Sequence, residues 1–190
     1  METKNILMIG VGGQGTILAS KILTSGLINA GYDVKMAEVH GMSQRGGSVY
    51  THVRYGEKIY SPIVGKGSAD VIVAFEKMEA LRCLPYLKIG GKMVVNDFEI
   101  NPIPVNLGQK EYPEGLLDEL KNHCDVLAFE AAEVAKELGN PKAMNVVLLG
   151  ALVKALGGLE HIDWDKEIEA NVKPQFVELN KAAFHAGYDL

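Results

Sequence analysis

The stretch Asn5-Ile6-Leu7-Met8-Ile9-Gly10-Val11-Gly12-Gly13-Gln14-Gly15 decides the fold class of this chain. An apolar run of strand length leads into a glycine-rich turn, and apolar residues then recur at helical spacing as far as Ala30. A second apolar run, Val34 to Val39, follows. This order is typical of a β-α-β unit with parallel strands. The sequence therefore predicts a Rossmann-like α/β fold with an open, mostly parallel sheet.

A second glycine-rich polar segment, His40-Gly41-Met42-Ser43-Gln44-Arg45-Gly46-Gly47, follows the second predicted strand. Successive parallel strands deliver their following loops to the same edge of an open sheet, where ligands bind. We therefore expect the two segments to lie side by side. The candidate ligand- or partner-binding residues at this edge are Gly10, Gly12, Gly13, Gln14, Gly15, His40, Gly41, Ser43, Gln44, Arg45, Gly46 and Gly47.

An antiparallel hairpin is expected directly after the second segment. Residues 48–55 alternate between apolar and polar side chains, as a half-buried strand does. Gly56-Glu57 then predicts a turn, and Lys58-Ile59-Tyr60-Ser61 predicts a return strand. The sequence thus indicates a hairpin inserted into the α/β frame.

The remainder of the chain predicts alternating strands and helices followed by C-terminal helices. Strands are expected at 71–75, 92–96 and 124–129, and helices at 76–87, 116–122, 130–138 and 144–156. Two short helices separated near Pro174 complete the chain. The prolines within 97–114 exclude helix there, and Pro102 and Pro104 bracket a short extended edge segment. No repeat or linker interrupts the pattern, so residues 1–190 are expected to form one domain.

Composition excludes several classes of function. The chain has 190 residues, 47% hydrophobic and 23% charged, with a net charge of −5 and no basic cluster. These values argue against a nucleic-acid partner. No apolar run approaches the ~20 residues that span a bilayer, and residues 1–4 lead into a strand without the features of a signal peptide. We expect a cytoplasmic protein that has no membrane partner.

The cysteines and histidines predict no metal site. Cys83 and Cys124 stand alone without a C-x-x-C motif, and the five histidines show no H-x-x-x-H spacing. Ser43 and His40 have no Asp or Asn placed to complete a triad, so no catalytic residue is assigned.

A different class of function remains open at the first glycine segment. Gly10-x-Gly12-x-x-Gly15 between a strand and a helix fits a dinucleotide fingerprint, and Glu38 stands where a ribose-binding acid is expected. The chain would then be a free-standing NAD(P)- or flavin-binding oxidoreductase. The second segment argues against this hypothesis, because it is dense in hydrogen-bond donors where adenosine would need room. A third hypothesis is that the chain is a pure assembly module, whose glycine-rich loops fit only the surface of a partner.

Four stretches carry a family resemblance: residues 10–15, Ala37 to Val49, Ser61 to Val64, and Ala69 to Glu76. Together they resemble the gamma subunit of 2-oxoacid:ferredoxin oxidoreductases, over essentially the whole chain. Residues 79–82 and 84–87 are most similar to the small (beta) subunit of the indolepyruvate branch of that family; pyruvate, ketoisovalerate and 2-oxoglutarate relatives share enough that the substrate stays open.

The resemblance implies a subunit of an enzyme that oxidatively decarboxylates a 2-oxo acid to an acyl-CoA. Thiamine diphosphate, Mg and [4Fe-4S] clusters would then be held by partner subunits, which pass electrons to ferredoxin, and the isolated chain would be inactive. It further implies that both glycine-rich segments face the partner's active-site region, where Arg45 could contact CoA or the substrate carboxylate. An interface of this kind, left uncovered, would favour a homodimer of the isolated chain.

Overall fold

The computed structural model describes residues 2–41 and 47–190. Its centre is a six-stranded sheet of order β2-β3-β1-β4-β5-β6. The strands are β1 (Lys4–Val11), β2 (Asp33–His40), β3 (Ser48–Gly56), β4 (Ala69–Ala74), β5 (Leu87–Asn96) and β6 (Asp125–Phe129). β1, β4, β5 and β6 pair in parallel, whereas β3 is antiparallel to both β1 and β2. The predicted α/β class with a mostly parallel sheet is confirmed.

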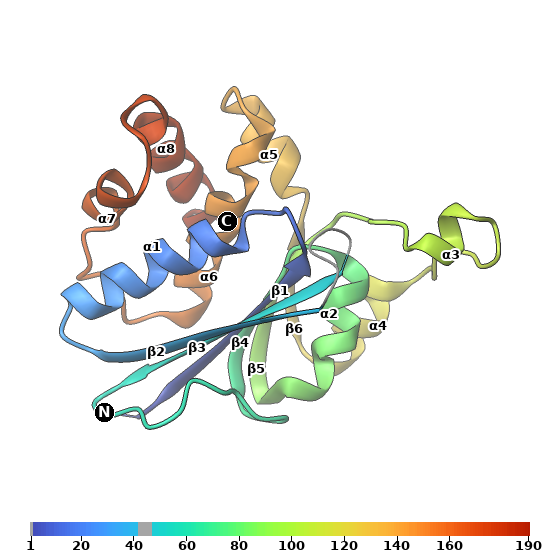
Figure 1. The fold of residues 1–190 in the computed structure, drawn as a ribbon, viewed down its shortest axis with the longest axis horizontal. Coiled ribbons are helices and arrows are strands. Elements are labelled where there is room, and N and C mark those ends of the chain that lie inside the picture. The colour runs from blue at the N-terminus through green and yellow to red at the C-terminus, as the bar shows by residue number, and fades with distance from the viewer. Residues whose placement is uncertain (1, 42–46) are drawn as a thin grey trace.

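Helices cover both faces of the sheet (Figure 1). The helices are α1 (Thr16–Asn29), α2 (Lys77–Cys83), α3 (Ile103–Asn106), α4 (Leu116–His123), α5 (Ala131–Glu137), α6 (Met144–Leu156), α7 (Trp164–Asn171) and α8 (Val177–Tyr188), with 3-10 turns at Leu84–Tyr86, Pro141–Ala143 and Pro174–Phe176. One apolar core lies between the sheet and α1, α5, α6, α7 and α8, and a smaller one lies under α2 and α4. The expected apolar helix at 144–156 is the centre of the larger core, where Val146 to Val153 are buried.

The antiparallel part of the sheet differs from the prediction. Residues 58–61 form no return strand, so the predicted hairpin is wrong in its second half. β3 instead pairs along its length with β2 on one side and β1 on the other, which leaves it no free edge. The backbone N–H of Ile59 donates to Asp33 Oδ2 at 2.8 Å, so this segment is held by a side chain instead of a strand ladder.

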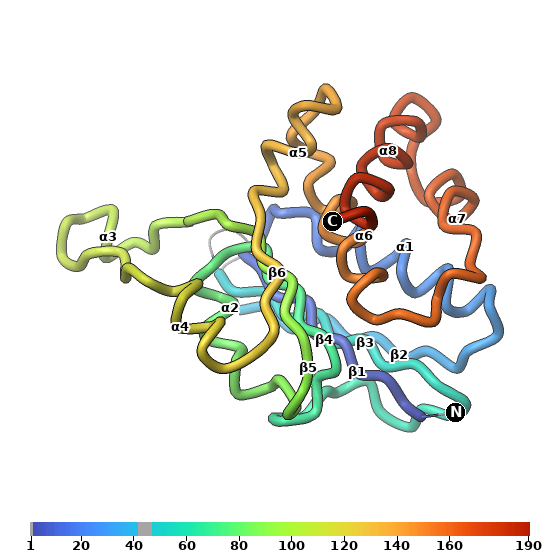
Figure 2. Tube along the Cα trace, turned by 180° about the vertical axis from the view of Figure 1, so that it is seen from behind, coloured from blue at the N-terminus to red at the C-terminus, as the bar shows by residue number. Residues whose placement is uncertain are grey.

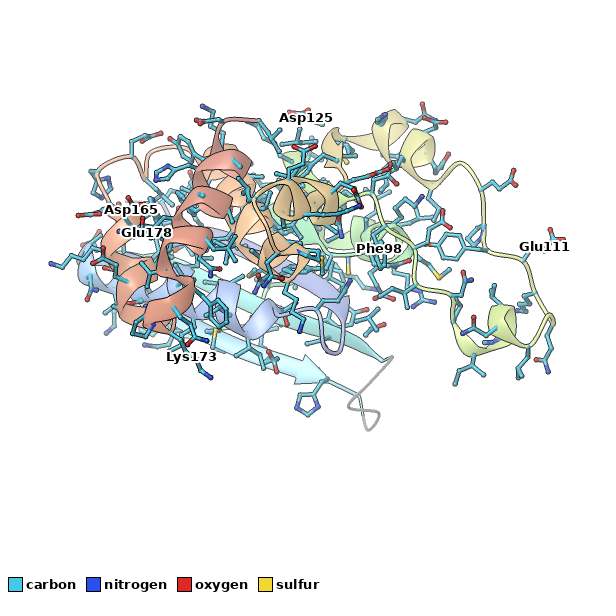
Figure 3. The ribbon with its side chains drawn as sticks, turned by 90° about the horizontal axis from the view of Figure 1, so that it is seen from above. Phe98, Glu111, Asp125, Asp165, Lys173 and Glu178 are labelled. Carbon is cyan, nitrogen blue, oxygen red and sulfur yellow. The ribbon has the colours of Figure 1, made fainter. Side chains whose placement is uncertain are left out.

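The prediction for residues 97–114 is also wrong, because α3 is a short helix. Pro104 lies in its first turn, where no intrahelical N–H bond is required and a fixed φ favours the helix. Residues 97–115 form an arm that projects from the body of the molecule in both views (Figures 1 and 2). Phe98 lies near its root and Glu111 far out along it (Figure 3).

Helix boundaries elsewhere agree with the sequence to within a few residues. The helix expected at 76–87 is shorter than predicted: α2 ends at Cys83, a 3-10 turn contains Pro85, and β5 begins at Leu87. Among the described residues, no helix is long and apolar enough to cross a membrane.

Candidate functional site

A cleft of about 410 Å³ lies where β1 and β2 end and where α1 and β3 begin. Its lining consists of Gly12, Gly13, Gly15, Thr16, Ile17, Glu38, His40 and Val49. The backbone N–H of Gly12 donates to the carbonyl of Gly47 at 3.1 Å. This bond places Gly47, the last residue of the second glycine-rich segment, beside the first segment at one edge of the sheet.

Gln14 holds the first segment in place from inside. Its side chain is buried, Oε1 accepts from the N–H of Val11 at 2.7 Å, and Nε2 donates to the carbonyl of Phe75 at 2.9 Å. A Cβ on Gly10 would lie 2.8 Å from Gln14 Oε1 and 3.0 Å from Phe75 Cβ. Gln14 therefore links the turn after β1 to Phe75 at the end of β4, and Gly10 leaves the space that its side chain needs. Both the oxygen and the nitrogen of the Gln14 amide are hydrogen-bonded within the protein.

Gly13 and Gly15 shape the turn that opens the cleft. Their φ values, +104° and +82°, lie in the region that glycine adopts most readily. Gly15 caps α1, and its carbonyl accepts from Asn145 Nδ2 at 3.0 Å. No atom lies within 4 Å of where a Gly13 Cβ would stand, so Gly13 borders open space.

The first turn of α1 gives the cleft a positive partial charge. No side chain caps this 14-residue helix, and its first turn contains no acidic residue. N–H groups at a helix N-terminus have no intrahelical partner and attract anions. The arrangement can therefore receive a carboxylate or phosphate group near Gly13 and Thr16.

The opposite wall of the cleft is formed by exposed residues at the end of β2. Glu38, His40 and Gly41 are all exposed, and His40 Nδ1 lies 3.3 Å from the Gly41 carbonyl. Ser43, Gln44, Arg45 and Gly46, which the sequence also nominates, lie outside the described residues.

The strand order departs from what a dinucleotide fingerprint requires. In that fold the acidic residue ends a strand that neighbours the first strand. Here β3 lies between them: Glu38 is opposite Thr51, and Thr51 is opposite Met8. At about 4.8 Å per strand, Glu38 stands about 10 Å across the sheet from β1. This placement disfavours the NAD(P) or flavin hypothesis.

Three buried side chains that sequence reasoning did not assign support the same edge. Asn96, at the end of β5, donates to the Phe75 carbonyl at 3.1 Å and accepts from the N–H of Ala131 at 2.9 Å. Glu76 caps α2, and Asn145 supports Gly15. Asn145 could have been noticed in the sequence as a polar residue at the start of an otherwise apolar helix. A buried polar side chain is usually hydrogen-bonded, so such a residue is expected to hold a neighbouring segment.

The cysteines are not placed for reaction. Burial raises the pKa of the Cys83 thiol to about 12, and burial also raises the pKa of the half-buried Cys124. Both groups therefore stay protonated near neutral pH, and the thiolate is the reactive form. No cluster of three or more His, Cys, Asp or Glu within 2–41 and 47–190 could hold a metal ion.

Residues 5–190 match the family described as pyruvate ferredoxin/flavodoxin oxidoreductase. The chain belongs to this family. It is 43% identical over 194 residues to the indolepyruvate oxidoreductase subunit IorB of Thermococcus kodakarensis, covering 98% of this chain and 95% of that one. The IorB subunit of Pyrococcus horikoshii is 42% identical with the same coverage.

Solved structures agree with this membership. The gamma subunit of the keto/oxoacid ferredoxin oxidoreductase from Geobacter sulfurreducens superposes with a TM-score of 0.71 at 27% identity, covering 98% of this chain and 96% of that one. The 2-oxoglutarate:ferredoxin oxidoreductase of Magnetococcus marinus shares the fold at a TM-score of 0.75 and 21% identity, and this chain spans 31% of its length.

Proposed function

We propose that this chain is the small, gamma-type subunit of a 2-oxoacid:ferredoxin oxidoreductase whose substrate is indolepyruvate. Near-complete coverage of the IorB subunits at 42–43% identity carries the proposal. We expect residues 1–190 to form one domain. We also expect the isolated chain to be inactive.

The cofactors of the reaction belong to partner polypeptides in this proposal. A [4Fe-4S] cluster takes four thiolates, and this chain has two cysteines. Thiamine diphosphate with Mg would supply the decarboxylation chemistry, and [4Fe-4S] clusters would carry the electrons to ferredoxin. The two thiols here are buried or half-buried, and both pack in the smaller core under α2 and α4.

The contribution of this chain is proposed to be a binding surface at the sheet edge. The N–H groups of the first turn of α1 favour an anionic group in the cleft. Arg45, with Ser43 and Gln44 beside it in sequence, would add a charged contact to CoA or to the substrate carboxylate. His40 and the glycines Gly12 and Gly13 would complete this surface against the partner.

Anaerobic co-purification of the tagged chain with its large subunit tests the assignment. Viologen reduction is then measured with indolepyruvate, phenylpyruvate, pyruvate and 2-oxoglutarate, with and without CoA. We expect an iron–sulfur partner, activity only in the complex, and the highest kcat/KM for indolepyruvate. Recovery of the chain alone with a bound dinucleotide would contradict the proposal.

A substitution in the assembled enzyme separates ligand binding from assembly. Arg45→Ala should raise the KM for CoA or for the 2-oxo acid while the complex still forms. Lys66→Ala is the matched control, because Lys66 is an exposed cation just before β4, at the opposite edge of the sheet. Unchanged kinetics of Arg45→Ala would favour the pure assembly module.

A further inference from the structure

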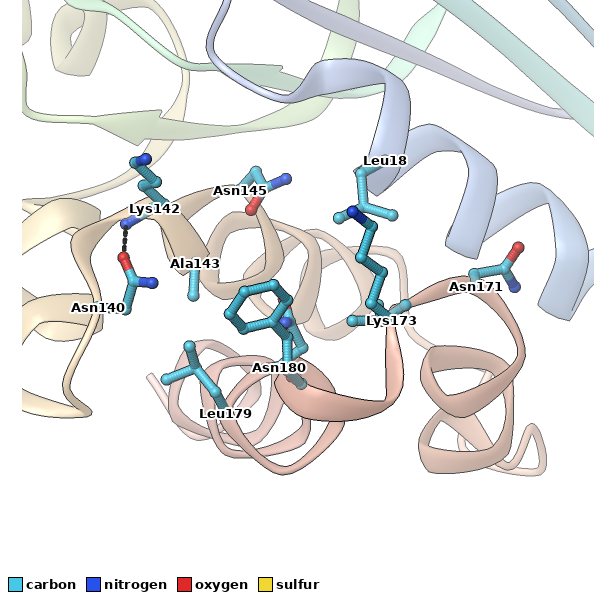
Figure 4. Close-up of a pocket in the computed structure, with 11 residues that line it drawn as sticks. Leu18, Asn140, Lys142, Ala143, Asn145, Asn171, Lys173, Leu179 and Asn180 are labelled. Atoms are coloured by element: carbon cyan, nitrogen blue, oxygen red, sulfur yellow. Dashed lines mark hydrogen bonds between the residues drawn. The ribbon is translucent and has the colours of Figure 1, made fainter.

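A second cavity, of about 390 Å³, lies between Leu18 of α1 and residues of the C-terminal helices (Figure 4). It opens to solvent and is bordered by α1, the turn before α6, and the segment that leads from α7 into α8. This volume falls within the range of small-molecule sites. Its apolar wall consists of Leu18, Ala143, Val172, Phe176 and Leu179.

Two buried asparagines in this cavity have acceptor oxygens to spare. Asn145 and Asn180 are 5% and 6% exposed, and each donates through Nδ2 to a backbone carbonyl, of Gly15 at 3.0 Å and of Phe176 at 2.8 Å. Within the described part of the chain, neither Oδ1 receives a hydrogen bond. Figure 4 shows Asn145 Oδ1 on the cavity side, with Nδ2 turned toward α1. Among the described residues, neither oxygen is a buried unpaired atom, so both reach the solvent in the cavity. A ligand that brings an N–H or O–H group can replace water at these acceptors.

The charge of the cavity is positive although the chain is acidic. Lys142 and Lys173 line it, and Asn145 lies between them in the view of Figure 4. Neither lysine has an ion pair among the residues that the structure describes, and no carboxylate lines the cavity. In a chain of net charge −5, a cavity with two lysines and no acid selects an anion.

An aromatic face completes the set of groups. Phe176 lines the cavity and keeps 39% of its surface exposed. Together with the leucines, its ring offers a surface on which a flat ring can stack.

We propose that this cavity binds an organic anion in which a flat ring bearing an N–H or O–H donor is joined to a carboxylate or phosphate group. The ring packs on Phe176, the donor bonds to Asn145 or Asn180, and the anionic group pairs with Lys173 or Lys142. Because Asn145 also bonds to Gly15, a ligand here is one side chain away from the glycine turn. The proposal does not depend on the function proposed above.

Titration of the isolated full-length chain, followed by NMR of its backbone and side-chain amides, tests the proposal. Indole-3-acetate represents the carboxylate source and adenosine 5′-monophosphate the phosphate source, with inorganic phosphate as the ring-free control. We expect saturable binding of one or both ring-bearing anions, with shifts at the side-chain amides of Asn145 and Asn180. The tighter ligand identifies the source of the anion. Absence of saturable binding by either, or equal binding of inorganic phosphate, would overturn the proposal.

Two variants locate the binding. Lys173→Gln should weaken affinity about fivefold, which is the scale of an exposed ion pair, and Phe176→Ala should weaken it by a similar factor through loss of stacking. Lys166→Gln is the matched control, since Lys166 is exposed on α7 outside the cavity. An amide spectrum as dispersed as that of the wild type establishes folding of each variant. Binding that neither cavity variant weakens would place the ligand elsewhere and overturn the proposal.

Discussion

The glycine turn after β1 and the arm after β5 leave the same edge of the sheet, yet they are held in different ways. The shape of the turn comes from its own residues: Gln14 bonds to Val11, three positions away, and Gly13 and Gly15 supply the required φ values. Bonds to Phe75, Gly47 and Asn145 then anchor the turn to other elements. The arm of residues 97–115 is held at its root by residues of another element. Local bonds give the turn its shape, whereas the arm depends on the correct placement of α2.

Glu76 and Lys77 are the residues that fix the arm. Glu76 Oε1 accepts from the Tyr112 hydroxyl and, at 3.5 Å, from the N–H of Ile100, so it reaches both legs. Lys77 Nζ lies 3.0 Å from Asp97 Oδ1 and 2.7 Å from Glu99 Oε1. The backbone N–H of Lys77 donates to the Phe98 carbonyl at 3.1 Å. These two carboxylates hold the pKa of Lys77 above its usual value against the effect of burial, so the ion pairs persist across the physiological range.

Replacing Glu76 should have the largest effect on how the arm is held. Glu76→Ala deletes a buried helix cap and the acceptor for Tyr112 and Ile100 together, and we expect a loss of about 3 kcal/mol in the free energy of unfolding. Urea denaturation measures this loss. Hydrogen exchange should show faster exchange at Ile100 and little change at Val11. Glu111→Ala, on the exposed arm, is the control and should change stability by less than about 0.5 kcal/mol. Equal losses in the two variants would contradict the role given to Glu76.

Alanine substitutions at Gly15 and Gly13 test how the turn after β1 is stabilised. Gly15→Ala places a Cβ at φ +82° and 2.6 Å from Asn145 Nδ2, so we expect a loss of about 2 kcal/mol from strain and a displaced hydrogen bond. Gly13→Ala has an unfavourable φ but open space, and should cost about 1 kcal/mol. Urea denaturation compares the two. If Gly13→Ala were the more damaging variant, Asn145 would not support the turn as described.

The smallest expected effect is the pH dependence of the segment after β3. Burial lowers the pKa of His52, whose Nδ1 accepts from the N–H of Val64 at 3.2 Å. The unfolded chain therefore binds more protons, so the stability contributed by neutral His52 is present above the unfolded pKa of about 6.5 and is lost as pH falls below it.

Unfolding free energies measured between pH 8 and pH 5 test this sign. His52→Asn, which keeps an acceptor but does not titrate, should flatten the decline in acid. His161→Gln, which alters an exposed ring, should leave the decline unchanged. A decline that survives in His52→Asn would assign the dependence to other groups.

Features set by local residue type could be predicted from the sequence, whereas most of those set by contacts with distant residues could not. Glycine positions, helical spacing and the junction of the two glycine segments could be predicted, because residue type and strand order carry that information. The strand predicted at 58–61 was wrong because Asp33 holds Ile59 by a bond across 26 residues. The extended segment predicted at Pro102–Pro104 was wrong because proline is also tolerated in the first turn of a helix, where Pro104 lies. Roles for Asn145 and Asn96 were equally hidden, since their partners lie on other elements.

Hydrogen exchange of the chain, free and in the anaerobically assembled complex, shows whether the partner covers the glycine cleft. We expect amides at residues 12–17 and 38–49 to exchange at least about tenfold more slowly in the active complex, because the partner covers the glycine cleft. Unchanged exchange at both segments in a complex that reduces viologen with indolepyruvate would contradict the claim that this sheet edge faces the active site.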